Sequence, residues 1–224
     1  MMSSEVENSL AEPAPYRRRG PNGLLKRGFD VVAASAMLVI FAPLMLAIAA
    51  MIWWVDGGRV VYRHERVGRN GTRFMCLKFR TMISNADEVL HDLLANDARA
   101  RAEWEMGRKL KDDPRILRTV GHFLRRSSLD ELPQIWNVLR GDMSIVGPRP
   151  VVRDELKLYG EWASLYLSVR PGLTGPWQVG GRSDTTYEHR VLLDVDYIRS
   201  WRLAHDLRIV ALTALMLVRG KGAY

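Results

Sequence analysis

The chain has very little cysteine and lacks the commonest signatures of nucleotide and metal sites. Cys76 is the only cysteine, so no intrachain disulfide can form and nothing requires an oxidising compartment. The five histidines show no ligand spacing, which argues against a histidine-based metal site. No Gly-x-Gly-x-x-Gly fingerprint, P-loop or internal repeat occurs. The sequence therefore offers none of the usual glycine-rich phosphate cradles.

Length and charge set broad limits on the class of protein. At 224 residues the chain is long enough for one domain with a real core plus a membrane element. Its formal net charge of +8 suits anionic partners, namely nucleic acid, acidic lipid headgroups or phosphorylated substrates. Charge alone does not choose among the three.

One long apolar segment stands near the N-terminus. Residues 31–55 contain no charge, and a helix of that length, at ~1.5 Å per residue, would be long enough to cross a bilayer. Pro43 lies near its middle, where proline breaks or kinks a helix. Both flanks are basic, so the positive-inside rule places both ends on the cytoplasmic side. We therefore predict a re-entrant membrane helix over residues 24–56, broken at Pro43. A kinked span and a signal peptide cleaved near residues 47–49 are the alternatives.

The rest of the chain predicts a mainly helical α+β fold. Residues 1–23 are polar, basic and expected to be disordered. Residues 60–68 and 72–79 read as strands joined by an Asn-Gly turn, the strongest short hairpin signal. Helices are predicted over residues 86–108, 129–140 (ending at Gly141), 154–168, 187–201 and 203–218, with a loop over 171–176. The apolar run 209–218 is too short to span a bilayer and suits an interfacial or a buried helix.

Two adjacent carboxylates, Asp130 and Glu131, open the predicted helix 129–140. Ser128 and Glu131 fit a capping box, and acids favour a helix N-terminus for purely structural reasons. The functional interpretation makes one carboxylate a nucleophile on phosphorus and its neighbour a metal ligand.

Basic residues elsewhere suit phosphate recognition. Arg149 stands between two prolines, which restrict the loop and present the guanidinium with little freedom; an ordinary surface turn is the alternative. Lys78 and Arg80 share one face at strand spacing, as a phosphate-facing pair or as the polar face of a half-buried strand. Four polar residues surround the glycine-rich segment, where they would contact a nucleotide or decorate a turn: Arg170, Gln178, Arg182 and Asp184.

Several motifs in fixed order strongly resemble the bacterial sugar transferases, the monotopic polyprenyl-phosphate phosphoglycosyl transferases. They are KRGFD (26–30), KFRTM (78–82), DDPR (112–115), SLDELPQ (128–134), NVLRGDMS (137–144), VGPRP (146–150) and RPGLTG (170–175). The short chain most resembles the ExoY-type transferases that begin exopolysaccharide synthesis, and the resemblance covers about residues 24–224.

The resemblance implies transfer of a sugar 1-phosphate, with galactose or glucose as the sugar, from a UDP-sugar to undecaprenyl phosphate, releasing UMP. Asp130 would form the phosphosugar intermediate, and Glu131, with Asp130, would bind Mg²⁺ or Mn²⁺. Lys78 and Arg149 match phosphate-contacting positions. The implied protein sits in the bacterial inner membrane on a re-entrant helix, with residues 57–224 as a cytoplasmic catalytic domain; a homodimer is possible and nucleic acid is not an expected partner.

The chain departs from the family pattern in two places. Ala42 precedes Pro43 where many members have serine, and residues 175–182 differ from the usual family segment, which leaves the role of Arg182 open. Two rival functions remain: a Leloir-type lipid glycosyltransferase releasing UDP, and a membrane-tethered basic binding protein without catalysis. The acids inside the best-defined motif disfavour the second rival.

Overall fold

The computed structural model describes residues 23–107, 110–118, 120–180 and 186–219. This part of the chain is mainly helical with two small sheets, which confirms the mainly helical α+β prediction. Residues 1–22 and Arg182 lie outside the described residues. The α-helices are α2 (Leu24–Asp56), α3 (Ala86–Asn96), α4 (Ala98–Gly107), α5 (Val120–Ser127), α6 (Gln134–Arg140), α7 (Arg153–Leu156), α8 (Ala163–Leu167), α9 (Pro176–Gly180), α10 (Tyr187–Arg199) and α11 (Leu203–Arg219).

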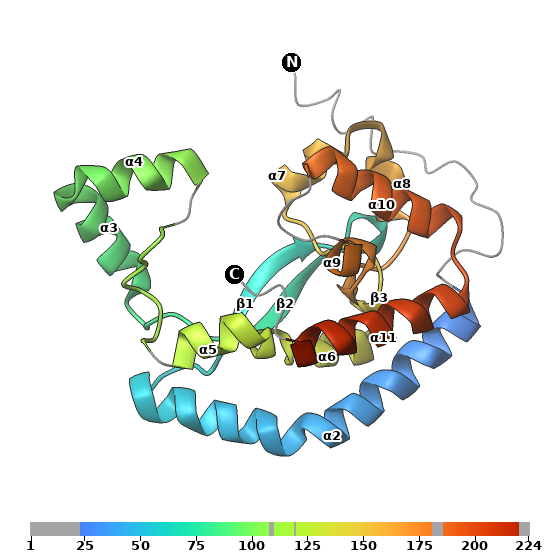
Figure 1. The fold of residues 1–224 in the computed structure, drawn as a ribbon, viewed down its shortest axis with the longest axis horizontal. Coiled ribbons are helices and arrows are strands. Elements are labelled where there is room, and N and C mark those ends of the chain that lie inside the picture. Colours follow the sequence, from blue (N-terminus) through green and yellow to red (C-terminus); the bar gives the residue numbers. More distant parts are fainter. Residues whose placement is uncertain (1–22, 108–109, 119, 181–185, 220–224) are drawn as a thin grey trace.

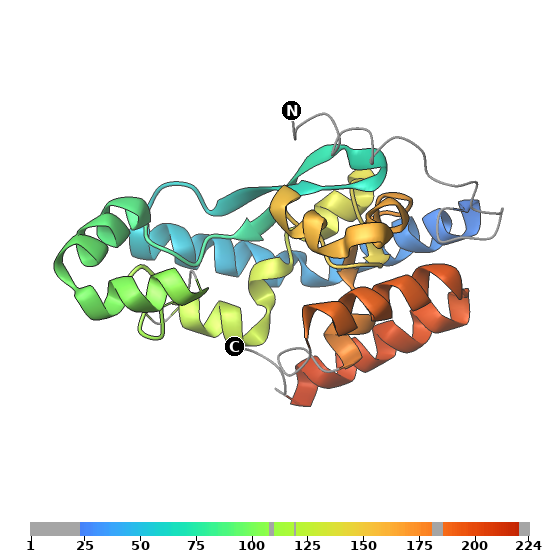
Figure 2. The same cartoon turned by 90° about the horizontal axis from the view of Figure 1, so that it is seen from above.

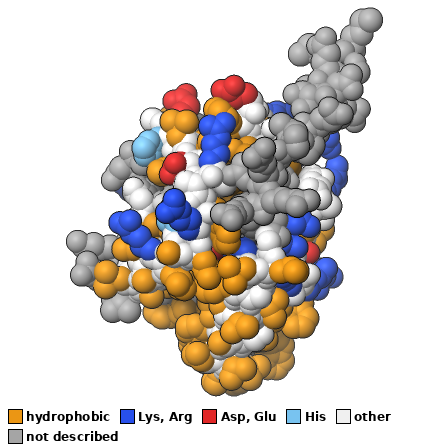
Figure 3. All heavy atoms as spheres, turned by 90° about the vertical axis from the view of Figure 1, so that its right-hand side faces the viewer, with side chains coloured by type: hydrophobic (Ala, Val, Ile, Leu, Met, Phe, Trp, Pro, Cys, Tyr) orange, Lys and Arg blue, Asp and Glu red, His pale blue; other side chains and the backbone are white. Residues whose placement is uncertain are grey.

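Helix α2 runs along one side of the molecule and bends near its middle (Figure 1). Helical backbone continues from Leu24 to Asp56, so the predicted break at Pro43 is a bend. Proline removes one backbone hydrogen bond and clashes with the preceding turn, which is sufficient to kink a helix without ending it. The helix is long and apolar enough to cross a membrane. Hydrophobic side chains gather on this side of the molecule (Figure 3). The exposed hydrophobic side chains of α2 include Ile40, Leu46 and Trp54.

The predicted hairpin is confirmed. Strands β1 (Val61–Val67) and β2 (Arg73–Phe79) pair antiparallel, joined by the 3₁₀ turn η1 (Arg69–Gly71) in which Asn70 has φ 57°. Asparagine tolerates this left-handed conformation better than most residues. The register sets Tyr62 opposite Lys78. Directly paired residues share a face, and alternate residues along a strand do too, so this register decides which side chains face the site.

A second sheet was not predicted. Strand β3 (Ser144–Val146) pairs in parallel with β4 (Gly172–Thr174), so the prediction of a loop over residues 171–176 was wrong at its centre. The strands are three residues long, too short for a periodic pattern to reveal. Their close approach requires glycine: a Cβ on Gly172 would lie 2.1 Å from the Gly147 nitrogen.

Two predicted helices are each divided. The prediction for 86–108 becomes α3 and α4, because the extended backbone of Asp97 ends α3 and its carboxylate accepts the amides of Arg99 and Ala100 at the start of α4. The prediction for 154–168 becomes α7, the 3₁₀ segment η3 (Lys157–Trp162) and α8, with Gly160 at φ 51° inside η3. The helices predicted over 187–201 and 203–218 are confirmed as α10 and α11. The α3–α4 pair lies at one end of the molecule and α10–α11 at the other (Figures 1 and 2).

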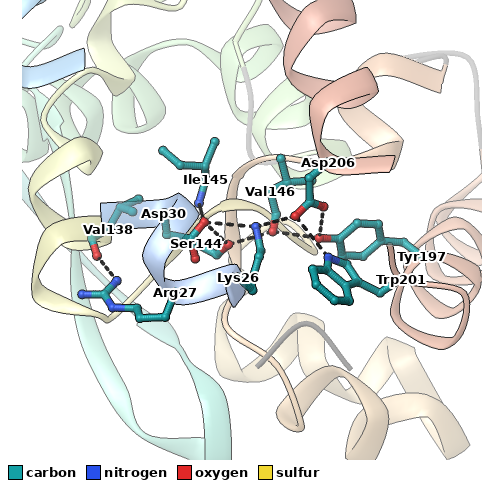
Figure 4. Close-up of polar contacts among 10 residues, drawn as sticks. All are labelled: Lys26, Arg27, Asp30, Val138, Ser144, Ile145, Val146, Tyr197, Trp201 and Asp206. Carbon is teal, nitrogen blue, oxygen red and sulfur yellow. Dashed lines mark hydrogen bonds and ion pairs between the residues drawn. The ribbon is translucent and has the colours of Figure 1, made fainter. Parts of the chain in front are cut away.

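The N-terminal end of α2 is held by a buried charged cluster (Figure 4). The Lys26 ammonium lies 3.0 Å from Asp30 Oδ1 and 2.9 Å from Asp206 Oδ2, and all three side chains are at most 1% exposed. Asp206 also accepts hydrogen bonds from Tyr197 Oη (2.7 Å) and Trp201 Nε1 (3.1 Å). Such a cluster is stable only when each buried charge has partners, as these do.

The same cluster reaches the second sheet and α6. Asp30 Oδ1 accepts the Ile145 amide and the Ser144 hydroxyl, each at 3.0 Å. The Arg27 guanidinium donates to the carbonyls of Val138 (2.7 Å) and Leu139 (2.8 Å) at the end of α6. The Arg27 side chain, on the first turn of α2, thus donates to two carbonyls in the last turn of α6, and the Val138 carbonyl also accepts the Gly141 amide at 3.0 Å.

Candidate functional site

A pocket opens between the hairpin, the start of α6 and the loops that follow β3 and β4. It is lined by Arg66, Cys76, Lys78, Glu131, Gln134, Arg149, Pro150, Gly172, Leu173 and Gln178. Four of the predicted site residues therefore meet in one place, although they are spread over a hundred positions of the sequence. Asp130 lies at its side, within 3.5 Å of Lys78 Nζ.

The two carboxylates stand in a 3₁₀ turn. η2 (Leu129–Glu131) carries them, and α6 begins only at Gln134, so the helix predicted from residue 129 starts later. Ser128 has φ 56° and its side chain makes no capping bond, so the capping-box interpretation was wrong. Gly141 ends α6 at φ 89°, as predicted. Both carboxylates lie close to the ammonium of Lys78 on strand β2.

Lys78 is the cation that lies beside both acids of the site. Its Nζ donates to Glu131 Oε1 at 2.6 Å and lies 3.5 Å from Asp130 Oδ2. Burial lowers the pKa of Lys78, but the Glu131 and Asp130 carboxylates outweigh it, so the net pKa lies above its ordinary value. Lys78 is therefore a permanent cation here, fixed between two acids.

Asp130 has a shifted pKa. Burial raises its pKa, and the charge of Glu131 adds to that effect, whereas Lys78 and Arg125 oppose it; the net pKa is raised. A carboxylate with a raised pKa in a pocket is a candidate for chemistry as well as structure. Its side chain is 13% exposed, so a substrate atom can reach it.

Arg149 is held against an aromatic side chain. Its guanidinium lies 5.4 Å from the ring centre of Trp177 in α9, and the guanidinium of Arg190 lies 4.5 Å from the same ring. The loop carrying Arg149 is fixed on both sides, since Gly147 donates to the Thr174 carbonyl at 2.9 Å and Gly172 donates to Pro148 at 2.7 Å. The second sheet therefore holds in place the loop that carries Arg149, whose freedom the two flanking prolines were predicted to restrict.

Arg80 does not join this group. Its guanidinium pairs with Asp56 Oδ2 at 2.5 Å and also donates to the Gly57 carbonyl, at the C-terminal end of α2. The Ser84 amide binds the same Asp56 oxygen at 2.9 Å. A substrate-contacting role for Arg80 stays a prediction, and its contacts in the structure tie β2 to α2. Arg182 lies outside the described residues, and its role also stays a prediction.

The lining residues that were not predicted as site residues include three with polar or ionisable side chains: Arg66, Cys76 and Gln134. The register of the predicted hairpin could have identified two of them, Arg66 and Cys76. Once Tyr62 pairs with Lys78, Arg66 and Cys76 fall on the same face as Lys78. Cys76 is buried, and burial raises the pKa of its thiol to about 11, so it is a poor nucleophile.

The described residues contain no group of three or more His, Cys, Asp or Glu side chains that could hold a metal ion by themselves. Mg²⁺ is commonly bound by one or two carboxylates and completed by substrate phosphates and water. The adjacent Asp130 and Glu131 fit that arrangement.

These features define a class: a helix long and apolar enough to cross a membrane, joined to a domain with a cationic pocket and paired acids suited to phosphoryl chemistry. The chain belongs to the bacterial sugar transferase family, whose sequence profile matches residues 21–220. It is 48% identical to an undecaprenyl-phosphate galactose phosphotransferase of Salmonella typhimurium, over 100% of this chain and 45% of that protein. It is 51% identical to the exopolysaccharide production protein ExoY of Rhizobium meliloti, over 90% of this chain and 89% of that protein.

A third relative differs in the sugar that it is named for. The chain is 38% identical to a UDP-glucose:undecaprenyl-phosphate glucose-1-phosphate transferase of Escherichia coli, over 92% of this chain and 42% of that protein. The chain thus spans somewhat less than half the length of the Salmonella and Escherichia proteins, and most of the length of ExoY.

Proposed function

We propose that this protein transfers a sugar 1-phosphate from a UDP-sugar to undecaprenyl phosphate, as the first step of exopolysaccharide synthesis. The relatives named for galactose and glucose transfer support the reaction class and leave both sugars open. The observation that carries the proposal is the pocket itself, which gathers Lys78, Glu131 and Arg149 beside the partly buried Asp130. Two cations and paired acids are what transfer between phosphate esters requires.

In the proposed mechanism Asp130 is the nucleophile. Its carboxylate oxygen bonds to the sugar-linked phosphorus while the bond from that phosphorus to the bridging oxygen breaks, releasing UMP. The oxygen of undecaprenyl phosphate then attacks the same phosphorus and frees the Asp130 carboxylate, leaving the sugar on a lipid diphosphate. Burial removes part of the hydration that would shield this nucleophile. Lys78, 3.5 Å away, opposes the rise in the pKa of Asp130 and so favours the ionised carboxylate.

Glu131 and Asp130 are the residues that would hold the magnesium or manganese ion. Such an ion, when bound, supplies positive charge that screens the acids from the substrate diphosphate. Arg149 would contact phosphate oxygens with its guanidinium, and Gln178, which lines the same pocket, would contact the donor.

We further propose that α2 is re-entrant and that the domain faces the cytoplasm on the inner membrane. Both ends of α2 are bound to the same body: Lys26 and Arg27 to α11 and α6 at one end, Asp56 to Arg80 at the other. A helix crossing the bilayer would place its ends on opposite sides, which these contacts oppose. The exposed apolar side chains of α2 would enter one leaflet instead.

Thiol labelling in cells tests the topology. Single cysteines replacing Gly23 and Arg59, at the exposed ends of α2, are both expected to resist a membrane-impermeant maleimide in spheroplasts and to react after lysis. The native Cys76 gives little background, because it is 3% exposed and its thiol pKa is about 11. Labelling of one end only in intact spheroplasts would establish a spanning helix.

Nucleotide release tests the activity. Purified protein in nanodiscs is incubated with undecaprenyl phosphate, Mg²⁺ and a panel of UDP-sugars. We expect UMP to appear in proportion to lipid diphosphate-sugar, and only with lipid and metal present. Release of UDP would identify a Leloir-type glycosyltransferase. Release of neither nucleotide by folded protein, together with salt-sensitive binding to anionic polymers, would favour the non-catalytic binding protein.

A further inference from the structure

Arg66 shares the pocket with the predicted site residues but has no assigned role. It lies on β1 opposite Phe74, and Lys78 lies on β2 opposite Tyr62. Because positions 62, 64 and 66 alternate on one face with their partners 78, 76 and 74, Arg66 and Lys78 face the same side of the hairpin. Arg66 pairs with Phe74, which lies four residues before Lys78 on β2, so the two cationic positions are ~13 Å apart along the strands.

The present contacts of Arg66 leave much of its guanidinium unused. One Nη lies 3.4 Å from Glu155 Oε2, a long ion pair, and the other donates to His64 Nδ1 at 3.1 Å. Burial, followed by the charges of Arg66 and Lys78, lowers the pKa of His64, which favours the neutral ring that can accept this bond. Arginine carries five N–H donors, and these two contacts engage two of them. The side chain is 18% exposed, so a ligand can reach it.

The direction of the hairpin indicates which substrate meets Arg66. β1 begins shortly after α2 ends, and the hairpin rises away from α2 toward α8 and α10 (Figure 1). Lys78 is paired near the α2 end, and Arg66 lies near the turn. With α2 in the membrane, as proposed above, a lipid phosphate would approach from the side of α2 and a water-soluble nucleotide from the far side.

We infer that Arg66 is a donor-binding residue, which contacts phosphate oxygens of the nucleotide diphosphate and exchanges its long contact with Glu155 for them. This inference rests on the proposed function. Arg66 and Arg149 would then hold the diphosphate from two sides, and Lys78 would remain with the acids where the sugar-linked phosphorus reacts. Bidentate guanidinium contacts suit this role better than an ammonium would.

A structural tie is the competing explanation. Arg66 connects β1 to α7 through Glu155, and Glu155 Oε2 also accepts the Val152 amide at 3.2 Å. If the tie were the whole role, removing either partner would have the same effect. If Arg66 binds the donor, Arg66→Gln weakens donor binding and Glu155→Gln does not.

The experiment compares Arg66→Gln, Arg66→Lys and Glu155→Gln, with Arg63→Gln as the matched control from the exposed side of the same strand. KM is measured separately for the UDP-sugar and for undecaprenyl phosphate, and UDP binding is measured by calorimetry. We expect Arg66→Gln to raise the donor KM and weaken UDP binding by about tenfold or more, as for a lost charged hydrogen bond. We expect the lipid KM of Arg66→Gln to stay near the wild-type value. Glu155→Gln and Arg63→Gln should keep both KM values and the UDP affinity near wild type, and Arg66→Lys should show an intermediate loss of donor binding.

Three results would overturn the inference: equal effects of Arg66→Gln and Glu155→Gln, a rise in the lipid KM without a rise in the donor KM, or unchanged UDP binding. Should Arg66→Gln not fold, Arg66→Lys carries the comparison, because it keeps the charge and loses the bidentate geometry. Failure of the proposed function is a different result. Wild-type protein that releases no UMP contradicts the reaction, whereas the calorimetry still reports whether Arg66 binds a nucleotide diphosphate.

Discussion

Asp130→Asn is expected to reduce turnover by roughly 10⁴-fold or more, because an amide cannot form the acyl phosphate on which the proposed reaction depends. The protein should remain folded. Burial raises the pKa of Asp130, so the ionised carboxylate is less stable in the folded protein than in water, and a neutral amide of the same shape removes that disadvantage. Lys78 keeps its 2.6 Å contact with Glu131.

The measurement is UMP release by the purified variant, together with trapping of radiolabelled sugar phosphate on the enzyme in the absence of lipid. Wild-type protein is expected to carry the label and Asp130→Asn is not. Asp87→Asn, an exposed position at the start of α3, is the matched control and should behave as wild type. Substantial turnover by Asp130→Asn with an intact fold would remove Asp130 as nucleophile.

Lys26→Met is expected to produce the largest loss of stability. The substitution fills a similar volume but leaves Asp30 and Asp206 buried without their cation. Removing one partner of a buried charged cluster costs about 3–5 kcal/mol, a large part of the stability of an ordinary domain. We expect a markedly lower midpoint of thermal unfolding in detergent or nanodiscs.

Lys157→Met is the matched control. Lys157 pairs with Asp154 at 2.9 Å, but its side chain is 68% exposed, and exposed pairs contribute about 0–1 kcal/mol. The triple variant Lys26→Met, Asp30→Asn, Asp206→Asn should recover part of the loss, because no unpaired charge remains. If Lys26→Met lowered the midpoint of thermal unfolding no more than Lys157→Met, the buried charged cluster would not contribute to the stability of the fold.

Local patterns predicted the elements whose cause is local. The Asn-Gly turn between alternating strands is sufficient for the β1–β2 hairpin, and α10 and α11 end near where their helical patterns end. The sequence motifs also selected residues that the fold brings together, with Lys78, Glu131 and Arg149 in one pocket. The divided helices were missed because single residues decided them. Asp97 supplies a cap for a new helix, and Gly160 adopts a left-handed conformation that interrupts one.

The second sheet and the partners of individual charged side chains depend on contacts between residues that are far apart in the sequence. Strands β3 and β4 exist because Gly147 and Gly172 allow two backbones to touch, and neither strand has a pattern of its own. Ser128 and Glu131 fit a capping box by spacing, but Ser128 adopts a left-handed conformation without a capping bond, and Glu131 contacts Lys78 instead. Arg80 shares a strand face with Lys78 by spacing, but Asp56 at the end of α2 takes its guanidinium.

By itself the sequence determined the long apolar helix, the hairpin and the paired acids of the site, because hydrophobic length, turn chemistry and motif order act over short stretches of chain. Tertiary structure alone decided the partners of each charge. Lys26 belongs to a basic flank in the sequence, yet the fold buries it between Asp30 and Asp206. Arg66 belongs to the opposite flank, yet the hairpin register places it in the pocket with Lys78. The physical reason is that a charge is stabilised by whichever groups lie within a few ångströms of it, and that neighbourhood exists only after the chain has folded.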